Sequence, residues 1–278
     1  MHNTGSIEVV NVSDVGRRRP HNEDSTLSDI DQGLVILADG MGGYKAGEIA
    51  SAIAVTAIYD EITDGLKRIQ PDQTDGGSGS IPSTLVKDAI IKANSSIYNT
   101  AQGDLQCQGM GTTVVVGLFH GDLITVAHVG DSRLYQKRGN DFQQVTVDHS
   151  LIQELINRGL YTPEEAAANT PKNLVTRALG IEKSVEVDVL EEKVLPGDIF
   201  LMCSDGLTDM VDDEEIHLTL SKYSANLVEA ARELVRLANA KGGKDNISVI
   251  LIRKLGGSSV FKGRIKKFFS HYFLNSGE

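Results

Sequence analysis

Residues 34–43 decide how the chain folds: Leu34-Val-Ile-Leu-Ala38 is followed directly by Asp39-Gly40-Met41-Gly42-Gly43. Five apolar residues bounded by glycine on either side are typical of a short buried strand. Apolar residues then recur with helical spacing from residue 46 to residue 64. We therefore expect the chain to leave a buried strand at Asp39, turn through the glycines and enter a helix, which leaves the carboxylate at the rim of a sheet.

Three further aspartates lie beside apolar runs that we interpret as strands. Asp131 follows residues 123–129, Asp205 follows residues 199–202, and Asp245 precedes residues 247–252. A carboxylate at the end of a buried strand is partly desolvated and rigidly held, which suits a hard divalent cation with oxygen ligands. A single Asp-Gly pair is most often only a turn. Four such strand ends, together with the acidic pair Glu23-Asp24, favour metal ligation, although the sequence alone does not show that they converge.

The other apolar patterns predict an α+β fold in which β-sheet packs under helices. Helical periodicity also covers residues 84–101 and 225–240. Runs that are apolar and rich in β-branched residues predict strands at 7–12, 33–38, 112–119, 123–128, 132–137, 199–202 and 247–252. Short turns join the runs 112–119, 123–128 and 132–137, so we expect these three to form an antiparallel meander.

Two segments interrupt this pattern inside what we expect to be one domain. Residues 70–83 are polar and rich in Gly and Ser, which predicts a surface loop between two helices. Residues 149–180 contain Thr162-Pro163-Glu164-Glu165, the sequence of a capping box at the start of a helix. We therefore interpret residues 149–180 as a helical insertion between strands.

Bulk composition excludes several classes of protein. The 278 residues are 40% hydrophobic and 23% charged, as is ordinary for a globular chain, and no apolar run is long enough to span a membrane. The N-terminus lacks the pattern of a secretion signal, and the only cysteines, Cys107 and Cys203, have no metal-ligand spacing. A cytoplasmic location is the expectation. The net charge of −11 disfavours binding to nucleic acid, which requires a basic surface.

A basic run precedes the acidic pair, with Arg17 to Arg19 followed by Pro20-His21-Asn22-Glu23-Asp24. An arginine guanidinium can hold a phosphate through two hydrogen bonds while nearby carboxylates hold cations. Read alone, the segment is better explained as a basic surface cluster followed by an acid pair at the start of a helix.

Taken in order, these segments resemble the metal-dependent protein phosphatases, the type 2C serine/threonine phosphatases, in their bacterial form. The resemblance spans roughly residues 7–252, nearly the whole chain, and although each motif is common alone, the ordered set is highly specific. The matching segments are residues 13–24, Leu37-Ala-Asp-Gly-Met-Gly-Gly43, Gly109-Met-Gly-Thr-Thr113, Val129-Gly-Asp-Ser-Arg-Leu-Tyr135, Val147-Asp-His-Ser150, Arg177-Ala-Leu-Gly180, Cys203-Ser-Asp-Gly-Leu207 and Gly243-Lys-Asp-Asn-Ile-Ser248.

The resemblance implies a sandwich of two antiparallel β-sheets with helices on both outer faces, and a centre of two Mn²⁺ or Mg²⁺ ions at one edge. Asp39 would bridge the ions, and the Gly40 carbonyl would ligate one of them. The other expected ligands are Asp205 and Asp245 on one ion, Glu23 and Asp24 on the other, and Asp131 with Asp205 on a third ion, for which Asp209 is a further candidate. Arg19 would bind the substrate phosphate.

The implied reaction is hydrolysis of phosphoserine and phosphothreonine by a metal-activated hydroxide, with no phosphoenzyme intermediate. Animal relatives carry a histidine where this chain has Met41, so the general acid is open between a metal-bound water and His149. For His149, a structural role in the insertion is the favoured interpretation. A second departure is Thr170, where many relatives have histidine before the proline, which leaves the contacts of the insertion to substrate in doubt.

The family pattern ends near residue 254, so we expect a phosphatase domain at 1–254 and a basic tail at 255–278. Within the tail, residues 260–273 predict an amphipathic helix. Its apolar face would carry Phe261, Ile265, Phe268, Phe269 and Tyr272, and its polar side Lys262, Arg264, Lys266 and Lys267. Such a helix can lie on an anionic membrane surface, dock on an acidic partner, or simply pack on the domain. The expected partners are phosphoproteins, including a serine/threonine kinase or its substrates, and the expected state is a monomer.

Three other functions fit the sequence less well. Residues 40–43 suggest nucleotide binding, but the dinucleotide fingerprint needs a third glycine where this chain has Lys45. A receiver-type phospho-acceptor domain would have a parallel sheet and about half this length. A phosphatase-like binding module without turnover is the more serious rival. All the matched carboxylates are present, however, and this favours an active enzyme.

Overall fold

The computed structural model describes residues 7–43, 45–68, 80–171 and 174–256. Its strands form two sheets in which every pair is antiparallel, and the short strand β4 (Gly111–Thr112) pairs with β3. The first sheet has the order β1 (Ile7–Asp14), β11 (Ile247–Lys254), β10 (Ile199–Cys203), β7 (Arg133–Arg138), β8 (Asp141–Gln144). The second has the order β2 (Asp24–Asp29), β3 (Leu34–Met41), β5 (Val114–His120), β6 (Leu123–Val129), β9 (Asp188–Lys193).

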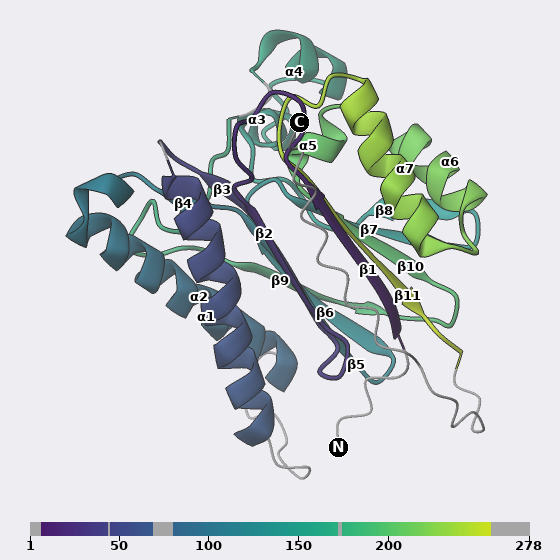
Figure 1. The fold of residues 1–278 in the computed structure, drawn as a ribbon, viewed down its shortest axis with the longest axis horizontal. Coiled ribbons are helices and arrows are strands. Elements are labelled where there is room, and N and C mark those ends of the chain that lie inside the picture. Colours follow the sequence, from purple (N-terminus) through teal and green to yellow (C-terminus); the bar gives the residue numbers. More distant parts are fainter. Residues whose placement is uncertain (1–6, 44, 69–79, 172–173, 257–278) are drawn as a thin grey trace, which may run out of the picture.

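Helices cover both outer faces of this sandwich (Figure 1). The long helices α1 (Ala46–Arg68) and α2 (Ile81–Gly103) lie on the second sheet, and α6 (Asp213–Lys222) and α7 (Leu227–Ala240) lie on the first. Short helical turns are η1 (Leu105–Cys107) and α5 (Asp205–Thr208). The α-β-β-α architecture expected from the resemblance is therefore confirmed. None of the helices in the described part of the chain is both long enough and apolar enough to cross a bilayer.

The alternation of side chains along β3 explains why its sequence is apolar without a break. Ile36 packs toward the helices of the second sheet, whereas Val35 and Leu37 point into the space between the two sheets. Because both faces of the strand are covered, period-two alternation demands apolar residues at every position. Between the sheets, Phe119 and Phe200 meet edge to face with ring centroids 5.6 Å apart, an arrangement that stabilises aromatic pairs.

The expected three-strand meander is wrong in its third strand. Residues 114–120 and 123–129 do pair as the hairpin β5–β6, but the next strand, β7, pairs with β10 and β8 in the other sheet. The Gly130-Asp131 turn is thus a crossover between sheets. A turn signal in the sequence reports that the chain bends, and the same residues serve a hairpin or a crossover.

Two predicted boundaries can be compared with the structure at the helices. Helix α2 begins at Ile81, capped by Ser80, whose hydroxyl oxygen accepts the Ser83 N–H, so residues 81–83 belong to a helix and not to the predicted loop. Residues 70–79 of that loop lie outside the described part. The capping box at Thr162 is confirmed, with its reciprocal hydrogen bonds to Glu165.

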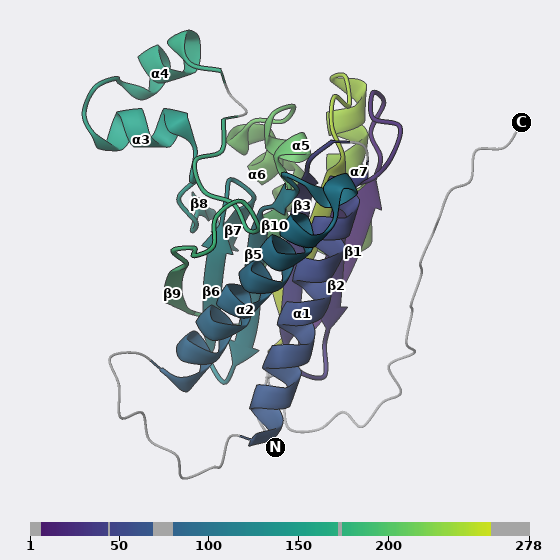
Figure 2. The same cartoon turned by 90° about the vertical axis from the view of Figure 1, so that its left-hand side faces the viewer.

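The insertion at residues 149–180 contains α3 (Leu151–Asn157) and α4 (Pro163–Asn169), as its helical interpretation predicted. Figure 2 shows these two helices standing apart from the sandwich, beyond the end of the sheets at which α5 lies. The predicted tail helix at 260–273 lies outside the described residues.

Candidate metal centre

Strand register places the first group of acidic residues together. Asp24 and Asp39 are direct partners across β2 and β3. The Gly40 N–H donates to the Glu23 carbonyl over 3.2 Å, which joins the two strands just beyond that pair. A Cβ atom at Gly40 would lie 2.1 Å from the carbonyl oxygen of Gly47. Glycine is therefore required for the first turn of α1 to approach so closely.

The backbone of Asp39 is held on both sides by two threonines. Its carbonyl accepts the Thr113 N–H over 2.9 Å and the Thr112 hydroxyl over 2.8 Å, and its N–H donates to the Thr113 hydroxyl over 3.1 Å. These bonds rigidly fix the strand end that carries the carboxylate. The segment Gly109-Met-Gly-Thr-Thr113 thus holds the backbone of Asp39 in place.

The second group of acids comes from the other sheet and meets the first at the same end of the sandwich. Asp205 follows β10 and Asp245 precedes β11, and these strands are neighbours. The carboxylate of Asp24 accepts a hydrogen bond of 2.9 Å from Ser204, the residue before Asp205. Asp131, on the crossover from β6 to β7, is buried nearby. The structure thereby brings together residues that lie up to 222 positions apart, from Glu23 to Asp245.

The carboxylates of the cluster lie close enough together to raise one another's pKa. Desolvation raises the pKa of Asp39 well above its ordinary value, and the negative charges of Asp24, Asp205, Asp131 and Asp245 raise it further, in that order. Desolvation is also the main cause that raises the pKa of Asp205, followed by repulsion from Asp131. So much concentrated negative charge in a partly desolvated site is costly unless a cation balances it.

Two of these acids have pKa values near neutrality. Desolvation raises the pKa of Asp24 to about 6, opposed by hydrogen bonds from Ser248 and Ser204. Burial, with repulsion from Asp148 next in size, raises the pKa of Asp131 to about 6. At neutral pH both groups carry charge that the described residues only partly balance.

The donor set fits hard divalent cations. Every ionisable group in the cluster offers oxygen, and the Gly40 carbonyl adds a neutral oxygen beside them. The Asp24 Oδ1 atom is fully buried and has no hydrogen-bond partner among the described residues. A buried carboxylate oxygen without a donor is expensive, and a cation would satisfy it. The residues that could hold such ions are Glu23, Asp24, Asp39, Gly40, Asp131, Asp205 and Asp245.

Arg19 lies at the rim of this cluster, as the sequence suggested. Its Nη2 atom is 2.6 Å from Asp245 Oδ2, and its side chain is 48% exposed. The hydrogen bond to Asp245 raises the pKa of the guanidinium, which therefore stays charged. Its position beside the carboxylates and open to solvent suits it to bind an incoming anion.

Asn246 is a residue that the sequence reasoning missed. Its side-chain oxygen accepts the Glu23 N–H over 2.8 Å, and its amide nitrogen donates to the carbonyls of Val15 and His21 over 3.0 and 2.9 Å. The residue is 4% exposed. One buried amide therefore ties the loop that carries Arg19 and Glu23 to the start of β11. Its position next to Asp245 was the only available signal.

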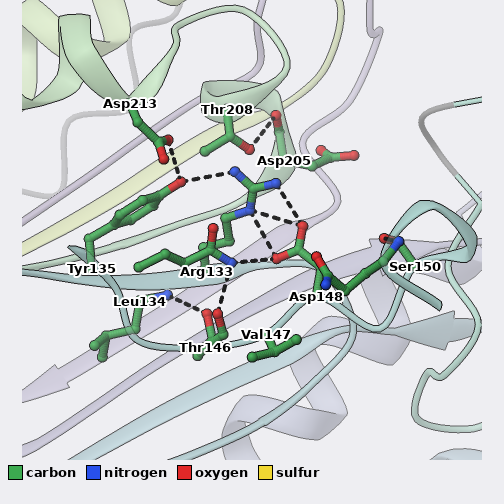
Figure 3. Close-up of polar contacts among 12 residues, drawn as sticks. Arg133, Leu134, Tyr135, Thr146, Val147, Asp148, Ser150, Asp205, Thr208 and Asp213 are labelled. Carbon is green, nitrogen blue, oxygen red and sulfur yellow. Dashed lines mark hydrogen bonds and ion pairs between the residues drawn. The ribbon is translucent and has the colours of Figure 1, made fainter. Parts of the chain in front are cut away.

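A partly buried ion pair supports the neighbouring crossover (Figure 3). Arg133 binds Asp148 through both Nε and Nη2 at 2.7–3.0 Å and donates from Nη1 to the Tyr135 hydroxyl over 2.9 Å. Tyr135 in turn donates to Asp213 at the start of α6, also over 2.9 Å. The network joins β7, the segment leading into the helical insertion, and α6. Arg133 is the register partner of Cys203, two residues before Asp205, so the network supports the strand end that carries Asp205 (Figure 3).

His149 belongs to a second network and does not face the acidic cluster. Its Nδ1 atom accepts the Gly130 N–H over 3.1 Å, its ring stacks on His128 with centroids 4.7 Å apart, and it is 8% exposed. His128, His149 and Asp188 lie close enough together to suggest a metal site. However, His149 Nδ1 accepts the Gly130 N–H, and Nε2 lies 3.1 Å from Arg177 Nη1 and 3.4 Å from Asp188 Oδ2, so both ring nitrogens already have protein partners. These contacts favour the structural interpretation of His149.

Comparison with known proteins agrees with this geometry. The family model for protein phosphatase 2C matches residues 17–248. A serine/threonine phosphatase stp of Listeria welshimeri is 37% identical over 245 residues, covering 87% of this chain and 94% of the relative. Protein phosphatase PhpP of Streptococcus pneumoniae is 36% identical over 253 residues, covering 88% and 97%.

Solved structures show the same fold. The Mycobacterium tuberculosis serine/threonine phosphatase PstP/Ppp superposes with a TM-score of 0.79 at 34% identity, covering 90% of this chain and 99% of that one. The catalytic domain of PstP in complex with two manganese ions gives a TM-score of 0.75, also at 34% identity and with the same coverage. The sandwich, the convergent carboxylates and the match over 17–248 lead to one conclusion: the chain belongs to the protein phosphatase 2C family.

Proposed function

We propose that this protein is a metal-dependent serine/threonine phosphatase that uses Mn²⁺ or Mg²⁺ and acts on phosphoserine and phosphothreonine in proteins. The observation that carries the proposal is the convergence of carboxylates from both sheets at one end of the sandwich, with Arg19 beside them. The names of the relatives, and the two manganese ions in the structure of PstP, support it.

The resemblance to the family suggests the roles of the site residues, and their convergence supports it. Asp39, the register partner of Asp24, would be shared by two cations. Asp205 and Asp245, from neighbouring strands of the first sheet, would complete one ion. Glu23, Asp24 and the Gly40 carbonyl would hold the other, and Asp131 with Asp205 would hold a third. When bound, the cations supply Lewis acidity and a water molecule that is acidic near neutral pH.

Arg19 would orient the substrate. Its guanidinium can form two parallel hydrogen bonds to phosphate oxygens, an arrangement that fixes both distance and angle. It is held 2.6 Å from Asp245, so the phosphate would be bound at the edge of the carboxylate cluster. There the positive charge also balances negative charge that develops on the phosphoryl oxygens.

Neither Met41 nor His149 is suited to protonate the leaving group. Met41 has no proton to donate, and His149 is buried against Gly130 and His128. We therefore propose that water in the site protonates the departing serine or threonine oxygen. Gln in place of His149 retains a hydrogen-bonding side chain. The variant His149→Gln should therefore unfold more easily than the wild type but keep the same pH profile of turnover.

The test of the proposed activity is turnover with and without divalent cations. Purified protein should hydrolyse p-nitrophenyl phosphate and a phosphothreonine peptide in Mn²⁺ or Mg²⁺, and excess EDTA should abolish both reactions. Readdition of Mn²⁺ should restore them, which separates loss of metal from irreversible damage. Turnover that resists EDTA would contradict the proposal.

We further propose that residues 1–254 act as a monomeric phosphatase domain in the cytoplasm, with phosphoproteins of a serine/threonine kinase as substrates. The tail at 255–278 would dock at an anionic membrane surface or on an acidic partner through residues 260–273. Deleting residues 256–278 and comparing liposome pelleting tests the membrane alternative. Equal pelleting of the two forms, or none in either, would contradict it, and size-exclusion chromatography with light scattering tests the monomer.

A further inference from the structure

Three basic residues beside the candidate metal centre have no part in the chemistry described above. They are Arg17 and Arg18, in the loop between β1 and β2, and Lys244, in the loop between α7 and β11, and all three are exposed. We refer to Arg17, Arg18 and Lys244 as the basic rim. Such a group of positive charges contrasts with the net charge of the protein, which is −11.

Contacts between the two loops show that the basic rim is one surface. The Arg17 N–H donates to the Gly243 carbonyl over 2.7 Å. A Cβ atom built on Gly243 would lie 2.8 Å from Arg17 Cγ, so the side chain of Arg17 crosses directly over the backbone next to Lys244. Figures 1 and 2 both show these loops side by side, above the end of the sandwich at which α5 lies.

The basic rim adjoins the place where the phosphate would bind. Arg18 precedes Arg19 and Lys244 precedes Asp245, and the side chains of Arg19 and Asp245 meet at 2.6 Å. An extended peptide advances about 3.3 Å per residue, and arginine and lysine side chains are long and flexible. The basic rim can therefore reach residues within about three positions of a phosphorylated residue held at Arg19.

The basic rim differs from most other surface charges of the protein because its charges are uncompensated. Many lysines and arginines elsewhere form pairs, such as Lys67 with Asp64 and Lys92 with Glu61. Among the described residues, no carboxylate lies within ion-pair distance of Arg17, Arg18 or Lys244. Three unpaired positive charges at the edge of an acidic site constitute an available surface for an acidic ligand.

We propose that the basic rim binds acidic side chains next to the phosphorylated residue, so that the protein prefers phosphopeptides with Asp or Glu close to phosphoserine or phosphothreonine. The proposal rests on the proposed phosphatase function and adds a substrate class to it. A different role for the same charges would be to attract any phosphate toward the acidic centre. That role would raise turnover of neutral and acidic peptides alike, and the experiment separates the two.

The test compares two phosphothreonine peptides of equal length, flanked within three residues by Glu in one and by Gln in the other. Each exposed ion pair contributes only a few tenths of a kcal/mol. Because three such pairs act together, we expect the wild type to favour the Glu peptide by about fivefold in kcat/KM at low salt. In the triple variant Arg17→Gln, Arg18→Gln and Lys244→Gln this ratio should fall close to one. Salt at about 0.5 M should reduce the wild-type ratio in the same way because it screens exposed charges.

A matched control removes the same number of positive charges from α1 and α2, which cover the outer face of the second sheet, away from the basic rim. The variant Lys67→Gln, Lys87→Gln and Lys92→Gln should keep the wild-type ratio. Equal kcat/KM for the two peptides in the wild type, or an unchanged ratio in the basic-rim variant, would overturn the proposal. Failure of the wild type to hydrolyse p-nitrophenyl phosphate in Mn²⁺ would instead overturn the phosphatase function itself.

Discussion

Asn246→Asp tests whether one buried amide holds the substrate-binding loop in place. The substitution keeps the shape of the side chain and leaves an oxygen to accept the Glu23 N–H. It replaces the NH₂ group, which donates to the carbonyls of Val15 and His21 over 3.0 and 2.9 Å, with an oxygen that cannot donate when ionised. Two carbonyl groups then lose their donor, and the new oxygen repels both.

The expected loss of stability can be worked out from these contacts. Leaving a buried acceptor unsatisfied costs about 1–3 kcal/mol, and the Asn246 side chain is almost fully enclosed. For two carbonyls the loss is about 2–6 kcal/mol, a large part of the roughly 5–15 kcal/mol by which a domain is stable. Protonation of the new carboxyl restores one donor, so the loss should shrink as the pH falls toward about 4.

Urea denaturation of the metal-free protein measures this loss directly, with Asn157→Asp as a matched control at an exposed position of α3. Kinetics add a second readout, because displacement of the loop moves Arg19. For the fraction that remains folded, the KM for p-nitrophenyl phosphate should rise more than kcat falls. A free energy of unfolding within about 0.5 kcal/mol of the wild type would refute the reasoning, because surface substitutions alone produce changes of that size.

Three further predictions follow from contacts and charges around the centre. In EDTA, Asp131→Asn should stabilise the protein by up to about 3 kcal/mol at pH 7.5, and calorimetry should show this gain fading as the pH falls through about 6. The sign follows because burial raises the folded-state pKa of Asp131 from 3.8 to about 6, so its charge begins to destabilise the fold as the pH rises above about 4 and does so fully above about 6. Gly206→Ala should lower the melting temperature and turnover together, since a Cβ atom there would lie 1.9 Å from the Asn246 carbonyl oxygen, and normal stability would contradict the close approach. A double-mutant cycle of Arg133→Met and Asp148→Asn should give a coupling energy above about 1 kcal/mol, because the pair is bidentate and largely buried, and additive losses would show that it contributes little.

Strands buried on both faces were predictable from the sequence, whereas of the four edge strands only β1 was predicted. Strands β3, β10 and β11 are nearly unbroken apolar runs because helices cover one face and the opposite sheet covers the other. The missed strands β2, β8 and β9 all lie at sheet edges and contain half-exposed or exposed polar residues. Their pairing is stabilised mainly by neighbours distant in sequence, and a local pattern carries little of that information.

The candidate site shows the same division between local and long-range information. Asp39, Asp205 and Asp245 could be singled out because each adjoins a recognisable strand. Their convergence depends on which strands share an edge of the sandwich, and only the ordered resemblance to a family made it predictable. Asn246 escaped notice because its role consists of three hydrogen bonds to a loop more than 200 residues earlier in the chain.

The most direct test of the metal centre is the amount of Mn²⁺ bound per chain by the wild type and by Asp39→Asn, measured by equilibrium dialysis alongside turnover. The wild type should bind at least two ions. Asp39→Asn should lose both tight Mn²⁺ binding and turnover. In EDTA it should nevertheless be at least as stable as the wild type, because it removes a carboxylate whose pKa is raised by burial and by repulsion from its neighbours. Wild-type manganese binding and turnover in Asp39→Asn would contradict the assignment of Asp39 as the ligand that the two ions share.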